Sequence, residues 1–154
     1  MPVGRPWGSV RRHQFMKLPI TGGCVCGAVR YQSDVEPVLM VRCHCRDCQR
    51  TTGGPYVPAV VFPMVAFRFT EGAVQHFATP SDKGGHNLRG FCLRCGSRIS
   101  GAEDPQRGII GVLASSLDDP TLFVPKFDMY VEDAQPWDVI DPAVKKFPKG
   151  MTGY

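Results

Sequence analysis

Seven cysteines stand in three short groups along this 154-residue sequence. In chain order the groups are Cys24 and Cys26; Cys43, Cys45 and Cys48; and Cys92 and Cys95. Thiolate sulfur is a soft ligand that suits zinc, and a short spacer between two cysteines lets both sulfurs reach one ion. The spacing therefore predicts metal sites rather than unrelated buried thiols.

The first and last groups each form a pair that could chelate one ion. In FCLRCGS, a two-residue spacer lets Cys92 and Cys95 face the same ion, and Gly96 permits the positive φ that such a turn often needs. In GGCVCGAV, Cys24 and Cys26 point to the same side of an extended chain, and the flanking glycines permit a bend. Two such pairs far apart in sequence predict a four-cysteine zinc site that ties two segments together.

The middle group, in VRCHCRDCQRTTGG, offers three thiolates from one loop: Cys43, Cys45 and Cys48. Structural zinc sites usually have four protein ligands, whereas catalytic sites keep one position for water or substrate. An open position could hold a small thiol as its thiolate, or polarise a carbonyl oxygen. Alternatively the protein closes the site, or the group is redox-active or empty. Residues that could close the site are His44, Asp47, His76 and His86.

The residues around the middle group have two interpretations. His44 should point away from the sulfurs in an extended segment, which favours a hydrogen-bonded core histidine over a ligand or general acid. Gly53 and Gly54 could let the backbone of a ligand approach closely. The polar residues that form either a solvated loop or a lip around an open position are Arg46, Arg50, Thr51 and Thr52.

Composition places the chain among ordinary globular proteins, with 43% hydrophobic and 21% charged residues. We expect a single domain over residues 16–154, preceded by a flexible extension at residues 1–15. No apolar run is long enough to span a membrane and no secretory leader is recognisable, so we expect the reducing cytoplasm. Seven thiolates on two zinc ions would cancel most of the formal net charge of +4, which argues against a nucleic-acid partner.

Short β-type segments separated by Gly, Pro and Asp predict a mainly β fold of two or three sheets that cover each other. Helical turns are expected after Cys45, near Asp118 and at residues 141–147. Pro58 and Pro63 predict an edge or bulged position for their strand. The expected strands cover residues 28–33, 38–43, 56–62, 66–71, 74–79, 87–91, 97–101, 108–113 and 126–131.

The segments GGCVCGAVRY, CHCRDCQRTTG, FCLRCGS and SLDDP together resemble the glutathione-dependent formaldehyde-activating enzyme family, also called the centromere-protein-V domain family. The resemblance spans about residues 22–137, and all seven cysteines fall in the family's order. It implies a β-tent fold of small stacked antiparallel sheets with short helical turns, stapled by zinc. It also implies two Zn²⁺ per chain. The structural ion would be held by Cys24, Cys26, Cys92 and Cys95, and the catalytic ion by Cys43, Cys45 and Cys48.

In its founding activity the family condenses glutathione and formaldehyde to S-hydroxymethylglutathione, a reaction classed with the carbon–sulfur lyases. The resemblance thus implies an enzyme that acts on a small, glutathione-like thiol and an aldehyde to form or cleave an S-hydroxymethyl adduct. Arg46, Arg50 or Arg94 could meet the carboxylates of such a thiol. Two alternatives stay open: a non-catalytic zinc-binding interaction module, and a redox sensor that uses the middle group. The thiol, the electrophile and the oligomeric state are not determined by the sequence.

Overall fold

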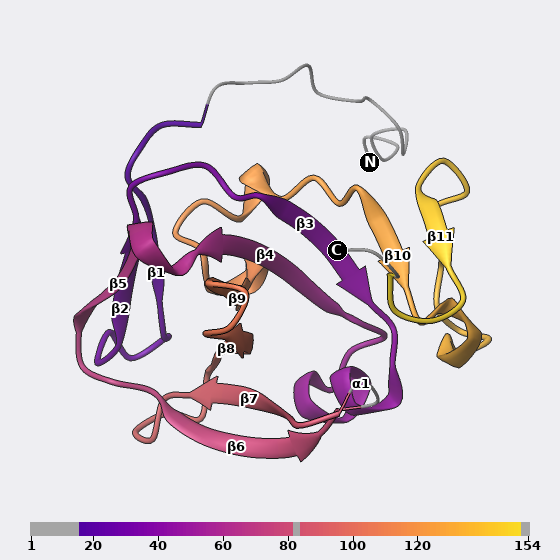
Figure 1. Ribbon diagram of the computed structural model, residues 1–154, viewed down its shortest axis with the longest axis horizontal. Helices are drawn as coiled ribbons and strands as arrows, with labels where there is room; N and C mark the ends of the chain where they lie inside the picture. Colours follow the sequence, from indigo (N-terminus) through magenta and orange to yellow (C-terminus); the bar gives the residue numbers. More distant parts are fainter. Residues whose placement is uncertain (1–15, 82–83, 152–154) are drawn as a thin grey trace, which may run out of the picture.

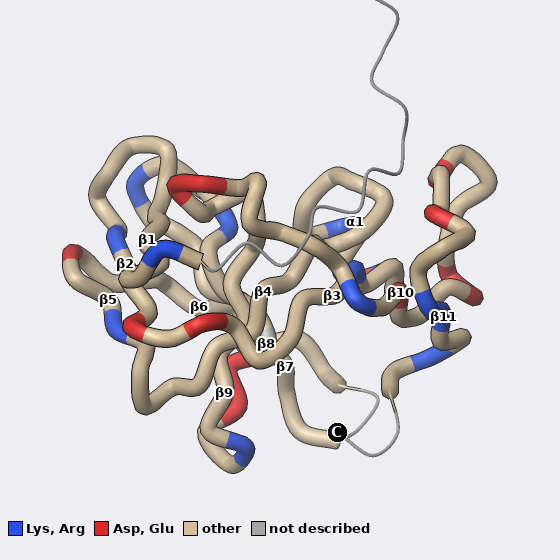
Figure 2. Tube along the Cα trace, turned by 90° about the horizontal axis from the view of Figure 1, so that it is seen from above, with Lys and Arg blue, Asp and Glu red and all other residues tan. Residues whose placement is uncertain are grey.

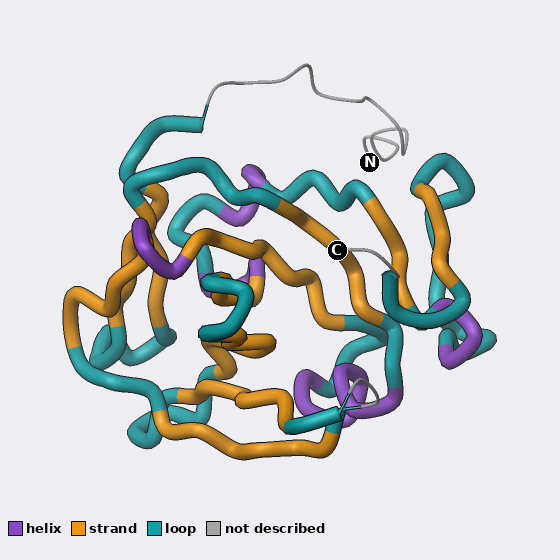
Figure 3. Tube along the Cα trace, viewed as in Figure 1, coloured by secondary structure: helices purple, strands orange, loops and turns teal. Residues whose placement is uncertain are grey.

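The structure is a computed structural model that describes residues 16–81 and 84–151, so the predicted extension at residues 1–15 lies outside the described residues. Strands dominate it, and the helices are short (Figure 3). The strands are β1 (Ile20–Gly23), β2 (Arg30–Ser33), β3 (Leu39–Cys43), β4 (Val57–Pro63), β5 (Phe67–Glu71), β6 (Gln75–Pro80), β7 (His86–Phe91), β8 (Arg98–Asp104), β9 (Ile109–Leu113), β10 (Phe127–Met129) and β11 (Lys145–Phe147). The helices are α1 (Arg46–Thr52) and the 3₁₀ turns η1 (Met64–Ala66), η2 (Ala114–Ser116), η3 (Pro120–Leu122) and η4 (Val131–Asp133).

Two sheets are formed, one of three strands in the order β1-β2-β5 and one of eight strands in the order β11-β10-β3-β4-β9-β8-β7-β6. The larger sheet bends strongly, so that β3 and β4 face β6 and β7 across β8 and β9, with α1 at the open end (Figure 1). Register shifts in the β7–β8 and β8–β9 pairings interrupt the ladder within this bend, as β-bulges do. The predicted mainly β fold with short helical turns is confirmed.

Two pairings differ from an all-antiparallel arrangement, because β10 runs parallel to both β3 and β11. A tight hairpin turn would force antiparallel pairing, whereas a long connection leaves either direction open. Residues 44–126 separate β3 from β10, and residues 130–144 separate β10 from β11. Local sequence patterns therefore could not fix these directions.

Each segment that was expected to be a strand contains one, but the expectation for residues 141–147 is wrong. Lys145–Phe147 forms strand β11 instead of a helical turn, because pairing with β10 satisfies its backbone. Strand β1 was not expected from the sequence. The helical turns after Cys45 and near Asp118 are confirmed as α1 and η3. Within the described residues, no helix has the length and apolar character needed to cross a lipid bilayer.

Strand β4 lies between β3 and β9, so the edge position expected from its prolines is wrong for the strand as a whole. Pro58 is opposite Arg42 of β3, but the pairing of β4 with β9 begins only at Ala59. Pro63 is the last residue of β4. Both prolines therefore stand at ends of the strand, where a missing N–H donor disturbs the ladder least.

The main core is formed by side chains from both sheets. Tyr31 of β2, Phe62 of β4, Ile99 of β8 and Val112 of β9 are almost completely buried in it. The ring of Tyr31 stacks on Phe67 with centroids 5.2 Å apart. The same core includes two of the cysteines, so the packing of the sheets and the geometry of one cysteine group depend on each other.

A buried ion pair joins two neighbouring strands of the large sheet. Arg42 of β3 donates from Nε to Asp128 of β10 at 2.5 Å and from Nη2 to the other carboxylate oxygen at 2.8 Å. The Asp128 side chain is fully buried, and the Arg42 side chain is 9% exposed. The Arg42 guanidinium also lies over the ring of Tyr56, 5.5 Å from its centroid.

Replacing Arg42 by methionine is expected to lower the free energy of unfolding by about 3–5 kcal/mol, because it leaves the buried Asp128 carboxylate without its charged partner. Urea denaturation followed by circular dichroism measures this loss. The matched control is Arg68→Met, which removes an exposed arginine paired with Asp34. That variant should cost less than about 1 kcal/mol. Equal losses in the two variants would contradict the importance of the buried pair.

Charged residues of both signs lie at both ends of the molecule, near β1 and β2 and near β10 and β11 (Figure 2). The absence of a nucleic-acid partner, expected from the charge balance, stays a prediction.

Candidate metal centres and the adjoining cavity

Four cysteines from two distant turns meet beside the core. Cys24 and Cys26 lie in the turn between β1 and β2, and Cys92 and Cys95 lie between β7 and β8. All four sulfur atoms lie within 4.8 Å of one another. The Sγ of Cys26 is 3.5 Å from that of Cys24 and 3.8 Å from that of Cys92. The structure thus brings together the four residues that the spacing grouped, in an arrangement that could hold a metal ion.

The backbone of both turns supports this arrangement. Gly96 has φ of 73°, as expected for the residue after the second cysteine, and its N–H donates to the carbonyl of Cys92 at 2.8 Å. A residue with a Cβ would be strained in that conformation. In the other turn, the backbone N–H of Val29 donates to Cys24 Sγ at 3.2 Å. Such N–H donors stabilise thiolate sulfur, the form that binds metal.

Hydrogen bonds from Ser97 favour the thiolate form of Cys95. The Ser97 hydroxyl lies 3.2 Å from Cys95 Sγ. By donating to the sulfur from its hydroxyl and its backbone N–H, Ser97 lowers the pKa of Cys95 to about 6. A thiol of that pKa is largely deprotonated at neutral pH, as a metal ligand must be.

The three remaining cysteines form a second cluster, at the start of α1. Cys43 ends β3, Cys45 is the N-cap of α1 and Cys48 lies in its first turn, with all three sulfurs within 4.8 Å of one another. The cluster packs against the apolar side chains of Val57 and Leu113. Hydrogen bonds from the Cys43 and Cys48 thiols lower the pKa of Cys45, and the same bond with Cys45 raises the pKa of Cys43. Thiols this close together titrate as a coupled group, in which the other two stabilise one thiolate by hydrogen bonds.

No histidine or carboxylate joins these three sulfurs in the part of the chain that the structure describes. His44 points away from them, as the alternation along the strand predicted: its ring is fully buried, with Nδ1 2.6 Å from Asp138 and Nε2 3.3 Å from Asp128. Nε2 of His76 lies 2.9 Å from Glu103. Asp47, another candidate for the fourth ligand, pairs with Arg89.

Contacts from the C-terminal part of the chain hold the three-cysteine loop in place. Besides the His44–Asp138 contact, the Gln49 amide donates to the carbonyls of His44 at 2.5 Å and of Asp133 at 2.9 Å. Gly53 then ends α1 with φ of 73°, which explains this glycine as a helix C-cap. Sequence reasoning missed Gln49, Asp133 and Asp138, because contacts over such separations leave no local pattern.

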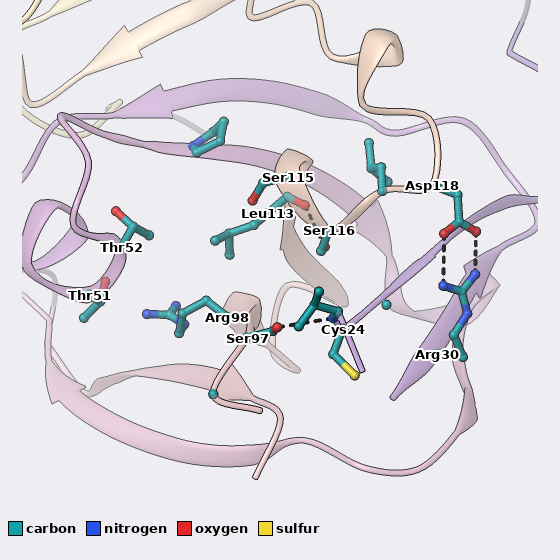
Figure 4. A pocket seen from close by; sticks show the side chains of 15 residues that line it. Cys24, Arg30, Thr51, Thr52, Ser97, Arg98, Leu113, Ser115, Ser116 and Asp118 are labelled. Atoms are coloured by element: carbon teal, nitrogen blue, oxygen red, sulfur yellow. Dashed lines mark hydrogen bonds and ion pairs between the residues drawn. The ribbon is translucent and has the colours of Figure 1, made fainter. Parts of the chain in front are cut away.

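A cavity of about 670 Å³ is lined by Cys24 of the four-cysteine cluster, whereas Cys43, Cys45 and Cys48 are not part of its lining. It reaches from Cys24 of the four-cysteine cluster to Thr51 and Thr52 at the end of α1 (Figure 4). Leu113, which packs against Cys48, is part of its wall. The further polar and charged side chains along its lining are Arg30, Ser97, Arg98, Ser115, Ser116 and Asp118.

An ion pair between Arg30 and Asp118 lies at one end of the cavity. Arg30 and Asp118 form two hydrogen bonds, and Thr21 donates to Asp118 at 2.6 Å. The bond from Arg30, followed by that from Thr21, lowers the pKa of Asp118. The first of the two aspartates in the SLDDP segment thus neutralises an arginine of β2 at the edge of the cavity.

The residues expected to form a lip are divided between two places. Thr51 and Thr52 line the cavity, whereas Arg46 and Arg50 line a separate hollow of about 180 Å³ with Trp137. Arg94 is exposed between the cysteines of its turn. Arg98, which does line the cavity, was missed, although it follows Cys95 by three residues at the start of an expected strand.

Comparison with known proteins agrees with the cysteine pattern and with the fold. A crystal structure of a Rhodobacter sphaeroides protein is similar over 64% of this chain and 87% of that one, with a TM-score of 0.50 and 21% sequence identity, which supports the fold alone. The sequence profile described as glutathione-dependent formaldehyde-activating enzyme matches residues 19–133, and this range contains all seven cysteines. The chain therefore belongs to the glutathione-dependent formaldehyde-activating enzyme family.

Proposed function

We propose that the protein is a zinc-dependent carbon–sulfur lyase that forms or cleaves the S-hydroxymethyl adduct of a small, glutathione-like thiol and an aldehyde such as formaldehyde. The observation that carries the proposal is the cluster of Cys43, Cys45 and Cys48, which has three sulfurs and no fourth ligand from the described residues. Leu113, which packs against Cys48, also lines the cavity of about 670 Å³ and so connects the cluster to it. Family membership supports formaldehyde and glutathione as the substrate classes.

The four-cysteine cluster fits a structural zinc ion. Sulfurs about 2.3 Å from a tetrahedral zinc ion are about 3.8 Å apart. The Sγ separations of 3.5 Å for Cys24–Cys26 and 3.8 Å for Cys26–Cys92 match that value. We assign this zinc site to Cys24, Cys26, Cys92 and Cys95, and the second site to Cys43, Cys45 and Cys48.

The residues of the chain have separate tasks in this mechanism. When bound by the three cysteines, zinc supplies a positive charge that favours the thiolate form of a substrate thiol at neutral pH. Val57 and Leu113 pack against Cys48 and make that side of the cluster apolar. The cavity orients the thiol, so that its sulfur attacks the aldehyde carbon. A carbon–sulfur bond forms, and the proton lost by the thiol ends on the former carbonyl oxygen.

Exchange spectroscopy by NMR tests the reaction directly. With ¹³C-formaldehyde and glutathione at equilibrium, the metal-loaded protein is expected to speed the exchange between free aldehyde and adduct above the rate without protein. The control is the Cys45→Ser variant, which keeps the four-cysteine site and should bring the exchange close to its uncatalysed rate. Unchanged exchange with both metals in place would contradict the enzyme and favour a non-catalytic zinc-binding module.

A further inference from the structure

Arg98 lies in the cavity wall and has no role in the reaction proposed above. It begins β8, its side chain is half-buried, and it points across the cavity toward Thr51 (Figure 4). Its Nη2 donates to the carbonyl of Ser100 at 3.1 Å. Its Nε is buried and has no hydrogen-bond partner among the described residues. A buried donor without a partner is rare in native proteins and calls for an explanation.

No carboxylate of the described residues forms an ion pair with Arg98, which distinguishes it from its neighbours. Arg30, also in the cavity wall, is neutralised by Asp118. Arg89 of β7 lies 3.5 Å from a carboxylate oxygen of Asp47 and donates to Thr79 at 3.0 Å. The cavity thus has one end where an arginine is paired with a carboxylate and one end where Arg98 has no carboxylate partner in the described part of the chain.

The surroundings of Arg98 favour the arrival of an anion. Burial, and then repulsion by Arg89, lower the pKa of Arg98, and a thiolate at Cys48 would offset this only in part. Leu113, which packs against Cys48 of the three-cysteine cluster, shares the cavity wall with Arg98. A ligand whose sulfur lies at that cluster could therefore place an anionic group at Arg98.

We propose that Arg98 recognises a carboxylate of the thiol substrate and so selects thiols that carry one over neutral thiols. This inference rests on the proposed function, because it assigns the charge of the substrate bound in the same cavity. A guanidinium matches the planar geometry of a carboxylate, and Thr51 and Thr52 form the facing wall, where their hydroxyls donate to the carbonyl of Cys48. A volume of about 670 Å³ is in the range of small-molecule sites and admits a ligand the size of a tripeptide.

The test measures binding without chemistry. S-methylglutathione keeps both carboxylates of glutathione but has no thiol, and its dimethyl ester has lost both negative charges. Isothermal titration of the metal-loaded, full-length protein compares these two probes in the wild type and in Arg98→Met. Arg68→Met is the matched control, because it removes an exposed arginine of β5 that is not part of the cavity wall.

We expect Arg98→Met to weaken the binding of S-methylglutathione by about ten- to a hundredfold, as for the loss of a hydrogen bond to a charged group. The dimethyl ester should bind the wild type and Arg98→Met equally weakly, and Arg68→Met should behave as the wild type. Equal affinity of Arg98→Met and the wild type for S-methylglutathione would overturn the inference, as would failure of the wild type to bind it. If the charge-dependent binding is present but no aldehyde exchange occurs, the proposed function fails while the role of Arg98 stands.

Discussion

Replacing Cys45 by serine is expected to remove one of two zinc ions per chain and to lower the rate of aldehyde–thiol exchange by at least about 100-fold. Cys45 caps helix α1, and its sulfur lies within 4.8 Å of both Cys43 and Cys48. Loss of groups that only support metal ligands already costs about 10- to 100-fold in metal affinity or activity, and loss of a ligand should cost no less. The fold should persist, because this cluster lies outside the main core.

Metal analysis of the purified variant, circular dichroism and the NMR exchange assay test this expectation together. Far-ultraviolet spectra should match those of the wild type while the zinc content falls from two to one per chain. Two zinc ions in Cys45→Ser would contradict the assignment of the second site. Full activity with a single remaining zinc would contradict the role of that site in the reaction.

Replacing Cys92 by serine is expected to have a different consequence, the loss of most of the stability of the fold. Cys92 is 1% exposed, belongs to the main core, and brings the β7–β8 turn to Cys24 and Cys26 in the β1–β2 turn. Structural zinc contributes about 10–16 kcal/mol of apparent binding energy in small zinc domains. That is as large as the whole stability of a typical domain, about 5–15 kcal/mol.

Urea denaturation separates the two cysteine variants, which undergo the same chemical change. Cys92→Ser should lose its cooperative unfolding transition or shift it to much lower urea, whereas Cys45→Ser should keep a transition near that of the wild type. Chelation of the wild type, which removes both ions, should reproduce the loss of stability expected for Cys92→Ser. An unchanged midpoint in Cys92→Ser would show that the four-cysteine cluster does not stabilise the fold.

The grouping of the cysteines could be predicted because short spacers limit where each sulfur can lie. The direction of His44 could also be predicted, since alternate residues of a strand face opposite sides. The partners Asp128 and Asp138 could not, because 84 and 94 residues separate them from His44. The position of Arg98 could not be predicted for a related reason, because only the bend of the large sheet places it opposite Thr51.

Local sequence patterns also decided which strands could be predicted. Segments with regular alternation of apolar residues were recognised, whereas β11 has three residues and two of them are exposed lysines. Its strand conformation depends on parallel pairing with β10, which no local sequence pattern predicts. Strand β1 contains two glycines, which disfavour strands in isolation and pair here with β2.

The contact between His44 and Asp138 shows that residues beyond the family match help to support the three-cysteine loop. The region shared with the family ends at residue 133, yet Asp138, five positions later, makes the shortest contact to the ring beside Cys43 and Cys45. A fragment trimmed at the shared boundary would contain every cysteine but would leave a buried imidazole without that carboxylate. The loop that carries Cys43, Cys45 and Cys48 would then be held less firmly than in the longer chain.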